Sequence, residues 1–188
     1  FDDGGKSALR IADIIEKYDC RGHFFITTSM IGTSTFLAKQ DIDELYKRGH
    51  IIGSHSHSHP DVFYDLSFDE MIKEWQTSMD ILSEIIQDQI LCASVPGGEM
   101  NYITQLSAQE VGLKILFTSE PTLKPWKLGD IICLGRVCPK KGTSIKQIID
   151  LANHRGLLKA IVERKIKNTV KKIYYPLRKY YKSKSIIE

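Results

Sequence analysis

The chain has 188 residues, of which 42% are hydrophobic and 26% are charged, a composition that excludes wholly disordered and fibrous proteins. The formal net charge of +3 conceals an asymmetry. Residues 1–154 hold 15 Lys and Arg against 21 Asp and Glu, whereas residues 155–188 hold 11 against 2. We therefore predict an acidic body over residues 1–154 and a basic tail over residues 155–188.

Short apolar runs alternate with helical patterns along the body. Helices are predicted, in chain order, over Lys6–Tyr18, Asp41–Arg48, Ser67–Asp88, Thr104–Leu113 and Ser144–Ala152. Ser67 and Glu70 form a capping box for the third of these helices, and Ser144 caps the fifth. Strands are predicted over His23–Thr27, His50–Ser54, Ile90–Val95, Ile115–Ser119 and Ile131–Val137. The first helix is indicated by apolar residues at helical spacing: Ala8, Ile11, Ile14, Ile15 and Tyr18. Because strands alternate with helices, we expect an α/β fold with a mostly parallel sheet, whose chemistry lies at the carboxyl ends of the strands.

The four cysteines follow no metal-binding or disulfide spacing. They are Cys20, Cys92, Cys133 and Cys138, and none forms a Cys-x-x-Cys pair. We interpret them as buried free thiols, and this usage favours a reducing environment, cytoplasmic or at a membrane periphery, over secretion.

Three predicted strand ends contain residues suited to catalysis. In the second, His55, His57 and His59 precede Pro60. If this segment stays extended, residues on one face lie ~6.6 Å apart and a His-x-His pair could chelate a metal. If the segment turns helically, residues four apart approach each other, and Pro60 suits such a turn. We favour His55 and His59 as a zinc-ligating pair, with His57 spare; a polar loop with histidines that only form hydrogen bonds is the alternative.

The first and third strand ends supply oxygen and amide groups. Asp2 and Asp3 would repel each other unless a cation neutralises one of them, although Asp-Asp-Gly is also an ordinary turn. With Asp3 bound to a divalent metal, Asp2 could act as a base toward water. Pro96 precedes Gly97 and Gly98, a sequence that fits any turn but could also expose the Gly97 N–H to a developing oxyanion.

A phosphate-binding loop is the competing interpretation of the first segment. Gly4-Gly5-Lys6-Ser7 precedes a predicted helix, as the end of a P-loop does. However, the full motif needs an earlier glycine, and Asp2 and Asp3 would repel phosphate.

Together these segments resemble the polysaccharide deacetylases of the NodB-homology type, carbohydrate esterase family 4. Phe1-Asp2-Asp3-Gly4 matches the family's aromatic-Asp-Asp-Gly motif, and His55 to Pro60 matches its His-Ser/Thr-x-x-His-Pro motif. The run His23–Thr28 resembles the family's second strand, and the resemblance extends to Ala152. It implies a distorted (β/α) barrel whose first strand is missing here. We accordingly expect a truncated chain in which Asp2 and Asp3 have no neighbouring strand to fix them.

The resemblance implies removal of N-acetyl or O-acetyl groups from a glycan. It makes Asp2 the catalytic base and assigns Asp3, His55 and His59 to a divalent metal, usually zinc. The Gly97 amide would help to stabilise the tetrahedral intermediate.

Three positions in two motifs depart from the family pattern. Ser94 replaces an Arg that orients the base, and Gly97 replaces an aromatic residue. Arg136 stands where the family has the histidine that acts as general acid; it could stabilise negative charge but not donate a proton at neutral pH. His154 could substitute, although a lone histidine beside a helix end is more often structural. Two alternatives to a glycan deacetylase therefore stay open: an impaired glycan-binding relative that keeps its metal, and a metal-dependent hydrolase of a small amide.

The basic tail over residues 155–188 has apolar residues near helical spacing, with Pro176 as a break. It predicts an amphipathic helix that either packs on the body or contacts an anionic membrane surface or an acidic glycan. No recognised nucleic-acid-binding module accompanies the charge, so we do not expect nucleic acid as a partner.

Overall fold

The computed structural model describes residues 1–139, 142–153, 155–167 and 169–170. The chain divides into two compact units. Unit 1 comprises Phe1–Ser119 and Lys124–Gly135, and unit 2 comprises Glu120–Leu123 and Arg136–Glu188. Over the described residues, no helix combines the length and apolarity that crossing a membrane requires.

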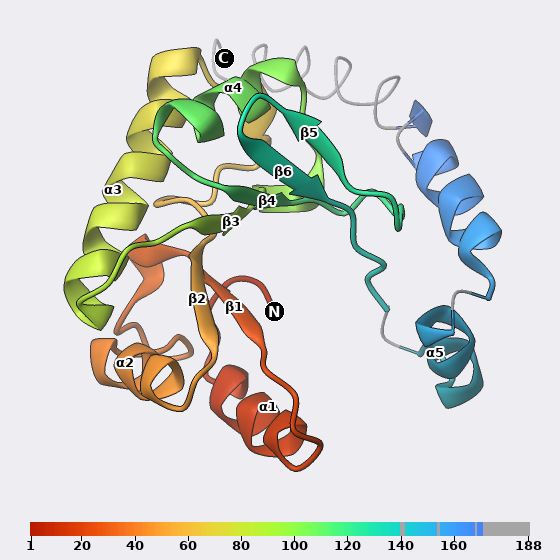
Figure 1. Ribbon diagram of the computed structural model, residues 1–188, viewed down its shortest axis with the longest axis horizontal. Helices are drawn as coiled ribbons and strands as arrows, with labels where there is room; N and C mark the ends of the chain where they lie inside the picture. The colour runs from red at the N-terminus through yellow and green to blue at the C-terminus, as the bar shows by residue number, and fades with distance from the viewer. Residues whose placement is uncertain (140–141, 154, 168, 171–188) are drawn as a thin grey trace, which may run out of the picture. The chain divides into compact units, whose positions relative to one another are not determined.

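Unit 1 is built on one sheet of six strands (Figure 1). The strands are β1 (His23–Ile26), β2 (Ile51–Ser54), β3 (Cys92–Ser94), β4 (Ile115–Phe117), β5 (Trp126–Leu128) and β6 (Ile131–Leu134). Their order across the sheet is β1-β2-β3-β4-β6-β5, and every neighbouring pair is parallel except β5 with β6. The mostly parallel α/β sheet predicted from the sequence is therefore confirmed. Among the described strands the sheet is open, with β1 and β5 at its two ends.

The antiparallel strand β5 was not predicted. It has only three residues, none of them buried, and it follows Pro125, so its sequence lacks the pattern of a strand. It pairs with β6, and Lys127 of β5 lies opposite Ile132 of β6 in this ladder. A short edge strand of this kind is specified by its neighbour rather than by its own residues.

Four helices cover the convex side of the sheet in unit 1 (Figure 1). They are α1 (Ser7–Glu16), α2 (Lys39–Lys47), α3 (Phe68–Ile86) and α4 (Tyr102–Glu110), and three short 3-10 helices occupy Thr28–Met30, Phe63–Asp65 and Pro96–Gly98. The predicted capping box of α3 is present, because Ser67 Oγ accepts from the Glu70 N–H and the Glu70 carboxylate accepts from the Ser67 N–H. The buried residues of α1 are Ala8 and Ala12, whereas Ile14 is 46% exposed. Tyr18, which is 75% exposed, lies beyond the end of this helix.

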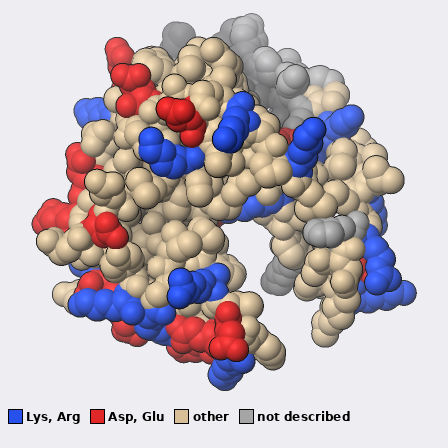
Figure 2. Space-filling model, viewed as in Figure 1, with Lys and Arg blue, Asp and Glu red and all other residues tan. Residues whose placement is uncertain are grey.

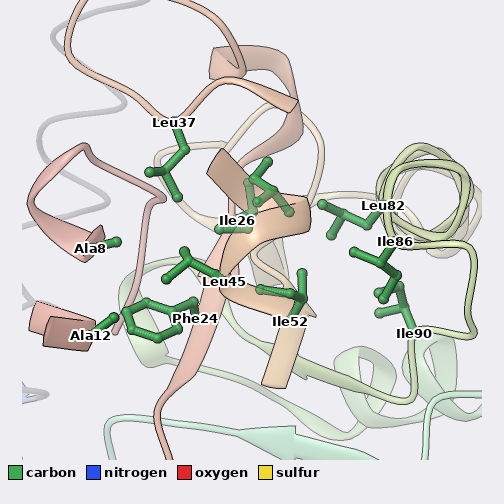
Figure 3. Close-up of a cluster of buried hydrophobic side chains, with 11 residues drawn as sticks. Ala8, Ala12, Phe24, Ile26, Leu37, Leu45, Ile52, Leu82, Ile86 and Ile90 are labelled. Carbon is green, nitrogen blue, oxygen red and sulfur yellow. The ribbon is translucent and has the colours of Figure 1, made fainter. Parts of the chain in front are cut away.

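Strand β1 separates two apolar regions. Phe24 and Ile26 point toward α1, α2 and α3 and pack with Leu45 and Leu82 in the cluster drawn in Figure 3. Phe25 lies on the opposite face, with its ring centroid 5.0 Å from that of Phe117.

Gly53 on β2 is required by this packing. A Cβ atom there would lie 2.6 Å from the Phe25 ring and 2.8 Å from the Cys92 carbonyl oxygen. Only glycine therefore lets β1, β2 and β3 approach as they do.

All four cysteines lie within the described residues and are free thiols. Cys92 and Cys133 are buried, and burial raises the pKa of each thiol to about 11. The prediction of burial is wrong for Cys20 and Cys138, which are exposed.

In unit 2, α5 (Ile145–Ala152) is followed by a helix over residues 157–167. Ser144 caps α5 by accepting a hydrogen bond from the Gln147 N–H, as predicted. Residues 171–188, which include Pro176 and most of the predicted tail, lie outside the described residues.

Candidate metal centre

The first three residues hydrogen-bond to the free edge of β1. The Phe1 amino group donates to the His23 carbonyl oxygen at 2.7 Å, and the Phe1 carbonyl accepts from the Phe25 N–H at 2.8 Å. The Asp3 carbonyl accepts from the Thr27 N–H at 3.3 Å. The expectation that Asp2 and Asp3 have no ladder to fix them is therefore wrong, because β1 holds this segment in register.

Asp3, His55 and His59 converge at the carboxyl end of the sheet. The Oδ1 atom of Asp3 lies 3.4 Å from His55 Nε2 and 3.6 Å from His59 Nε2. One ligand atom from each residue lies within 4.8 Å of the others, and the two imidazole centroids are 5.0 Å apart. The predicted pair of histidines and the predicted carboxylate thus share one site.

A second contact orients His55. Its Nδ1 lies 2.8 Å from the Ser94 carbonyl oxygen, which can only accept a hydrogen bond. The neutral imidazole therefore carries its proton on Nδ1, and the lone pair of Nε2 faces Asp3. Histidine ligands to metals are oriented by this kind of contact.

The side-chain contact between Asp3 and His55 is the largest cause of the lowered pKa of the Asp3 carboxyl. Burial acts in the opposite direction, and the nearby imidazoles of His55 and His59 lower the pKa further. Asp3 is consequently ionised at neutral pH and available as an anionic ligand.

The histidine loop, Ser54 to Pro60, does not turn helically as predicted. Ser56 and His59 have φ of 61° and 52°, and this irregular turn brings His59 back toward His55. The Ser56 hydroxyl accepts from the His59 N–H at 3.0 Å, which closes the turn. Pro60 follows the turn without starting a helix. The predicted convergence is correct, but left-handed residues rather than a helical turn produce it.

Two neighbouring elements hold the histidine loop. The carboxylate of Glu74 on α3 accepts from the His57 N–H at 2.9 Å, and from the Ser58 N–H and hydroxyl at 2.8 Å each. His57 Nδ1 lies 2.9 Å from the Thr28 hydroxyl, so His57 is the spare histidine that the sequence suggested. Glu74 was not predicted as part of the site, because its place on α3 gives no sign of which loop it reaches.

Asp2 lies beside the metal ligands in sequence and contacts Ser94. The Ser94 hydroxyl donates to Asp2 Oδ2 across 3.4 Å, a long contact for a hydrogen bond between oxygens. Ser94 thus meets Asp2 at the position where the family resemblance places an arginine.

The turn after β3 is built from glycines in left-handed conformation. Gly97 and Gly98 both have φ of 69°. A Cβ atom on Gly97 would meet no heavy atom within 4 Å, so its backbone borders open space. A Cβ atom on Gly98 would lie 1.8 Å from the Ser119 hydroxyl oxygen, so this position admits only glycine.

The structure does not test the roles predicted for two further residues. Arg136 belongs to unit 2, which is described separately from unit 1, and its role stays a prediction. His154 lies outside the described residues.

The donor set fits a divalent cation of the zinc class. Two Nε2 lone pairs and one carboxylate oxygen approach from two chain segments, with one tautomer fixed by a carbonyl group. Such two-histidine, one-carboxylate sets leave coordination positions for water or substrate.

Comparison with known proteins agrees with this geometry. The family model described as polysaccharide deacetylase matches residues 1–116. An uncharacterized 30.6 kDa protein in the fumA 3'region of Geobacillus stearothermophilus is 29% identical over 133 residues, which make up 69% of this chain and 48% of that protein. The chain therefore spans about half the length of this curated relative.

Two solved structures show the same fold at low identity. The Streptococcus pyogenes deacetylase PplD in complex with acetate has a TM-score of 0.69 at 20% identity, over 80% of this chain and 67% of that one. A CE4 family pseudoenzyme from Bacillus anthracis has a TM-score of 0.54 at 17% identity, over 62% of this chain and 40% of that one. Since the family model matches more than half of the sequence and spans both the Asp-Asp and the histidine segments, this chain belongs to the polysaccharide deacetylase family.

Proposed function

We propose that this chain is a metal-dependent hydrolase that removes N-acetyl or O-acetyl groups from a polysaccharide or amino-sugar glycan, with zinc as its ion. The observation that carries the proposal is the meeting of Asp3, His55 and His59 around one point, next to Asp2 in the chain. Family membership supports the glycan as substrate class. The same proposal includes two statements about architecture. One is the distorted barrel that the resemblance implies, and the other is a division into a catalytic body, residues 1–154, and a tail, residues 155–188.

The chain's own residues have distinct roles in this reaction. A divalent cation held by Asp3, His55 and His59 would supply Lewis acidity toward the acyl carbonyl and toward water. Asp2 accepts, at its carboxylate, the proton of the water that attacks the carbonyl carbon. The Gly97 N–H donates a hydrogen bond to the oxyanion that develops on the acyl oxygen, and the open space at Gly97 is consistent with such an approach. Arg136 stabilises negative charge on the acyl group or on the leaving group.

Acetate release from N-acetylated oligosaccharides, measured with zinc-loaded protein, tests this proposal. We expect turnover by the native protein and a loss of at least ~100-fold in Asp2→Asn, because the amide cannot accept the proton. Asp2→Asn should bind zinc as the native protein does, since Asp2 is not in the ligand set. Full activity of Asp2→Asn would rule out Asp2 as the base.

A second candidate is a catalytically impaired, glycan-binding relative that keeps the metal site. The departures at Ser94 and Arg136 support it, and a CE4 family pseudoenzyme from Bacillus anthracis has a similar fold. Zinc binding and oligosaccharide binding without acetate release would favour this candidate. Release of acetate from small acetamides but not from oligosaccharides would favour a hydrolase of a small amide.

We also propose that residues 155–188 contact an anionic membrane surface. The described part of the helix exposes an apolar stripe at four-residue spacing: Leu158 (79% exposed), Val162 (54%), Ile166 (59%) and Val170 (57%). Among the charged side chains that Figure 2 shows on unit 2, Lys and Arg outnumber Asp and Glu. An apolar stripe beside cationic residues suits an anionic lipid surface, where the aliphatic groups enter the interface and the lysines meet the headgroups.

A further inference from the structure

We infer that Ser94 is a positioning residue with two separable functions. Its backbone carbonyl orients the metal ligand His55, and its side-chain hydroxyl orients the proposed base Asp2. This inference rests on the proposed function, since it assigns Ser94 to the reaction in which Asp2 accepts a proton.

The place of Ser94 in the sheet makes it a rigid support. It is the last residue of β3 and pairs with Phe117 on β4, and the next residue, Val95, donates its N–H to the Phe117 carbonyl at 3.0 Å. The side chain of Ser94 is fully buried. A residue fixed by a central strand and without solvent exposure holds both of its polar groups in constant directions.

The two groups of Ser94 reach two different residues of the site. The carbonyl oxygen lies 2.8 Å from His55 Nδ1, and the hydroxyl lies 3.4 Å from Asp2 Oδ2. Hydrogen bonds at catalytic residues are often long before substrate binds and shorten in the complex. A donor that fixes the direction of the carboxylate keeps one oxygen of Asp2 available to the attacking water.

Side-chain substitution separates the two functions, because it leaves the carbonyl in place. Ser94→Ala removes the contact to Asp2 and keeps the contact to His55. We expect zinc affinity, measured by competition with a chromophoric chelator, to change by less than about threefold. We expect kcat for acetate release to fall on the order of tenfold or more while KM stays constant, as for other residues that orient reacting groups.

Three further variants make the test specific. Ser94→Thr keeps the hydroxyl and should recover most of the lost kcat. In an Asp2→Asn background, Ser94→Ala should cause no further loss, because a residue that acts through Asp2 has no effect without it. Ser107→Ala is the matched control: Ser107 is also a fully buried serine, but its hydroxyl contacts Trp75 Nε1 and the Thr104 carbonyl. This control should retain kcat.

The outcomes distinguish failure of this inference from failure of the proposed function. Native kcat in Ser94→Ala overturns the inference, and so does an equal loss in the native and Asp2→Asn backgrounds. Absence of acetate release by the native protein refutes the proposed function instead. Crystal structures of the native and Ser94→Ala proteins then decide the inference. A reoriented Asp2 carboxylate beside an unchanged His55 ring supports it, and an unchanged Asp2 carboxylate overturns it.

Discussion

At the residue scale, the site is assembled from residues in unfavourable backbone conformations. Asp3, Ser56 and His59 are three of the five non-glycine residues with positive φ among the described residues. Each such residue costs on the order of 1 kcal/mol or more, which surrounding contacts must offset. Here the ladder to β1 and the hydrogen bonds that the loop donates to the Glu74 carboxylate supply those contacts. The same strain that destabilises the loop directs His59 toward Asp3.

The histidine loop allows a matched test of ligand identity. His59→Gln should weaken zinc binding by ~100-fold or more, because it removes an imidazole whose Nε2 faces Asp3. His57→Gln, two residues away, should keep the affinity within several-fold, since His57 faces Thr28 rather than the centre. Isothermal titration calorimetry with zinc measures both variants. Equal losses in the two variants would contradict the assignment.

At the element scale, a group of charged side chains forms an ionic clamp that joins α1 to the end of α2. The clamp lies at the amino ends of β1 and β2, whereas the candidate metal centre lies at their carboxyl ends. Arg48 donates to Glu16 Oε1 at 2.8 Å and to Asp13 Oδ1 at 2.6 Å, both on α1. It also lies 3.3 Å from Glu44 on its own helix, and His50 Nε2 lies 2.9 Å from Glu16 Oε1. The hydrogen bond from Arg48 is the largest cause of the lowered pKa of Glu16.

This clamp predicts an acid-dependent contribution to stability. Folding lowers the pKa of Glu16 below its usual 4.5, so the stabilisation is complete above pH 4.5 and is lost as pH falls through the lowered pKa. Arg48→Gln should therefore reduce the free energy of unfolding at pH 7 and have a smaller effect at pH 3. Urea unfolding at both pH values measures this difference.

Lys47→Gln is the control for the clamp. It removes the same charge one residue earlier, but Lys47 pairs with a residue of its own helix, Asp43, at 2.6 Å. Exposed pairs of this kind contribute little, so this variant should change stability less than Arg48→Gln at pH 7. A pH-independent effect of Arg48→Gln would show that Glu16 is not its partner in solution.

At the scale of the whole molecule, charge is segregated along the chain rather than balanced. The net charge is −6 over residues 1–154 and +9 over residues 155–188, from 15 against 21 and 11 against 2 charged residues. Such a distribution favours anionic partners for the tail and disfavours them for the body.

The proposed membrane contact predicts binding to anionic vesicles that depends on the tail lysines. Co-sedimentation with phosphatidylserine-containing vesicles should exceed that with phosphatidylcholine alone and should fall with added salt. A variant with three lysines of the helix replaced by Gln should bind ~100-fold more weakly, at about 1 kcal/mol per lysine. The three are Lys159, Lys165 and Lys167.

A body variant with the same loss of charge should bind vesicles as the native chain does. It replaces three exposed lysines of unit 1: Lys17, Lys39 and Lys73. Equal vesicle binding by the native chain and both variants would refute a lipid-facing role for residues 155–188.

By itself, the sequence determined the α/β alternation, the capping box of α3 and the serine cap of α5, and it predicted that Asp3, His55 and His59 meet at one site. These features are local, because apolar spacing, a serine before a helix and a short histidine motif are all visible within a few residues. Only the tertiary structure decided how the site is supported. Three sets of hydrogen bonds support it: those between Phe1 and β1, those from the histidine loop to Glu74 on α3, and those of Ser94 with His55 and Asp2. They join residues between 16 and 92 positions apart. Neither side-chain periodicity nor motif spacing encodes such contacts, because they depend on how the strands and helices pack.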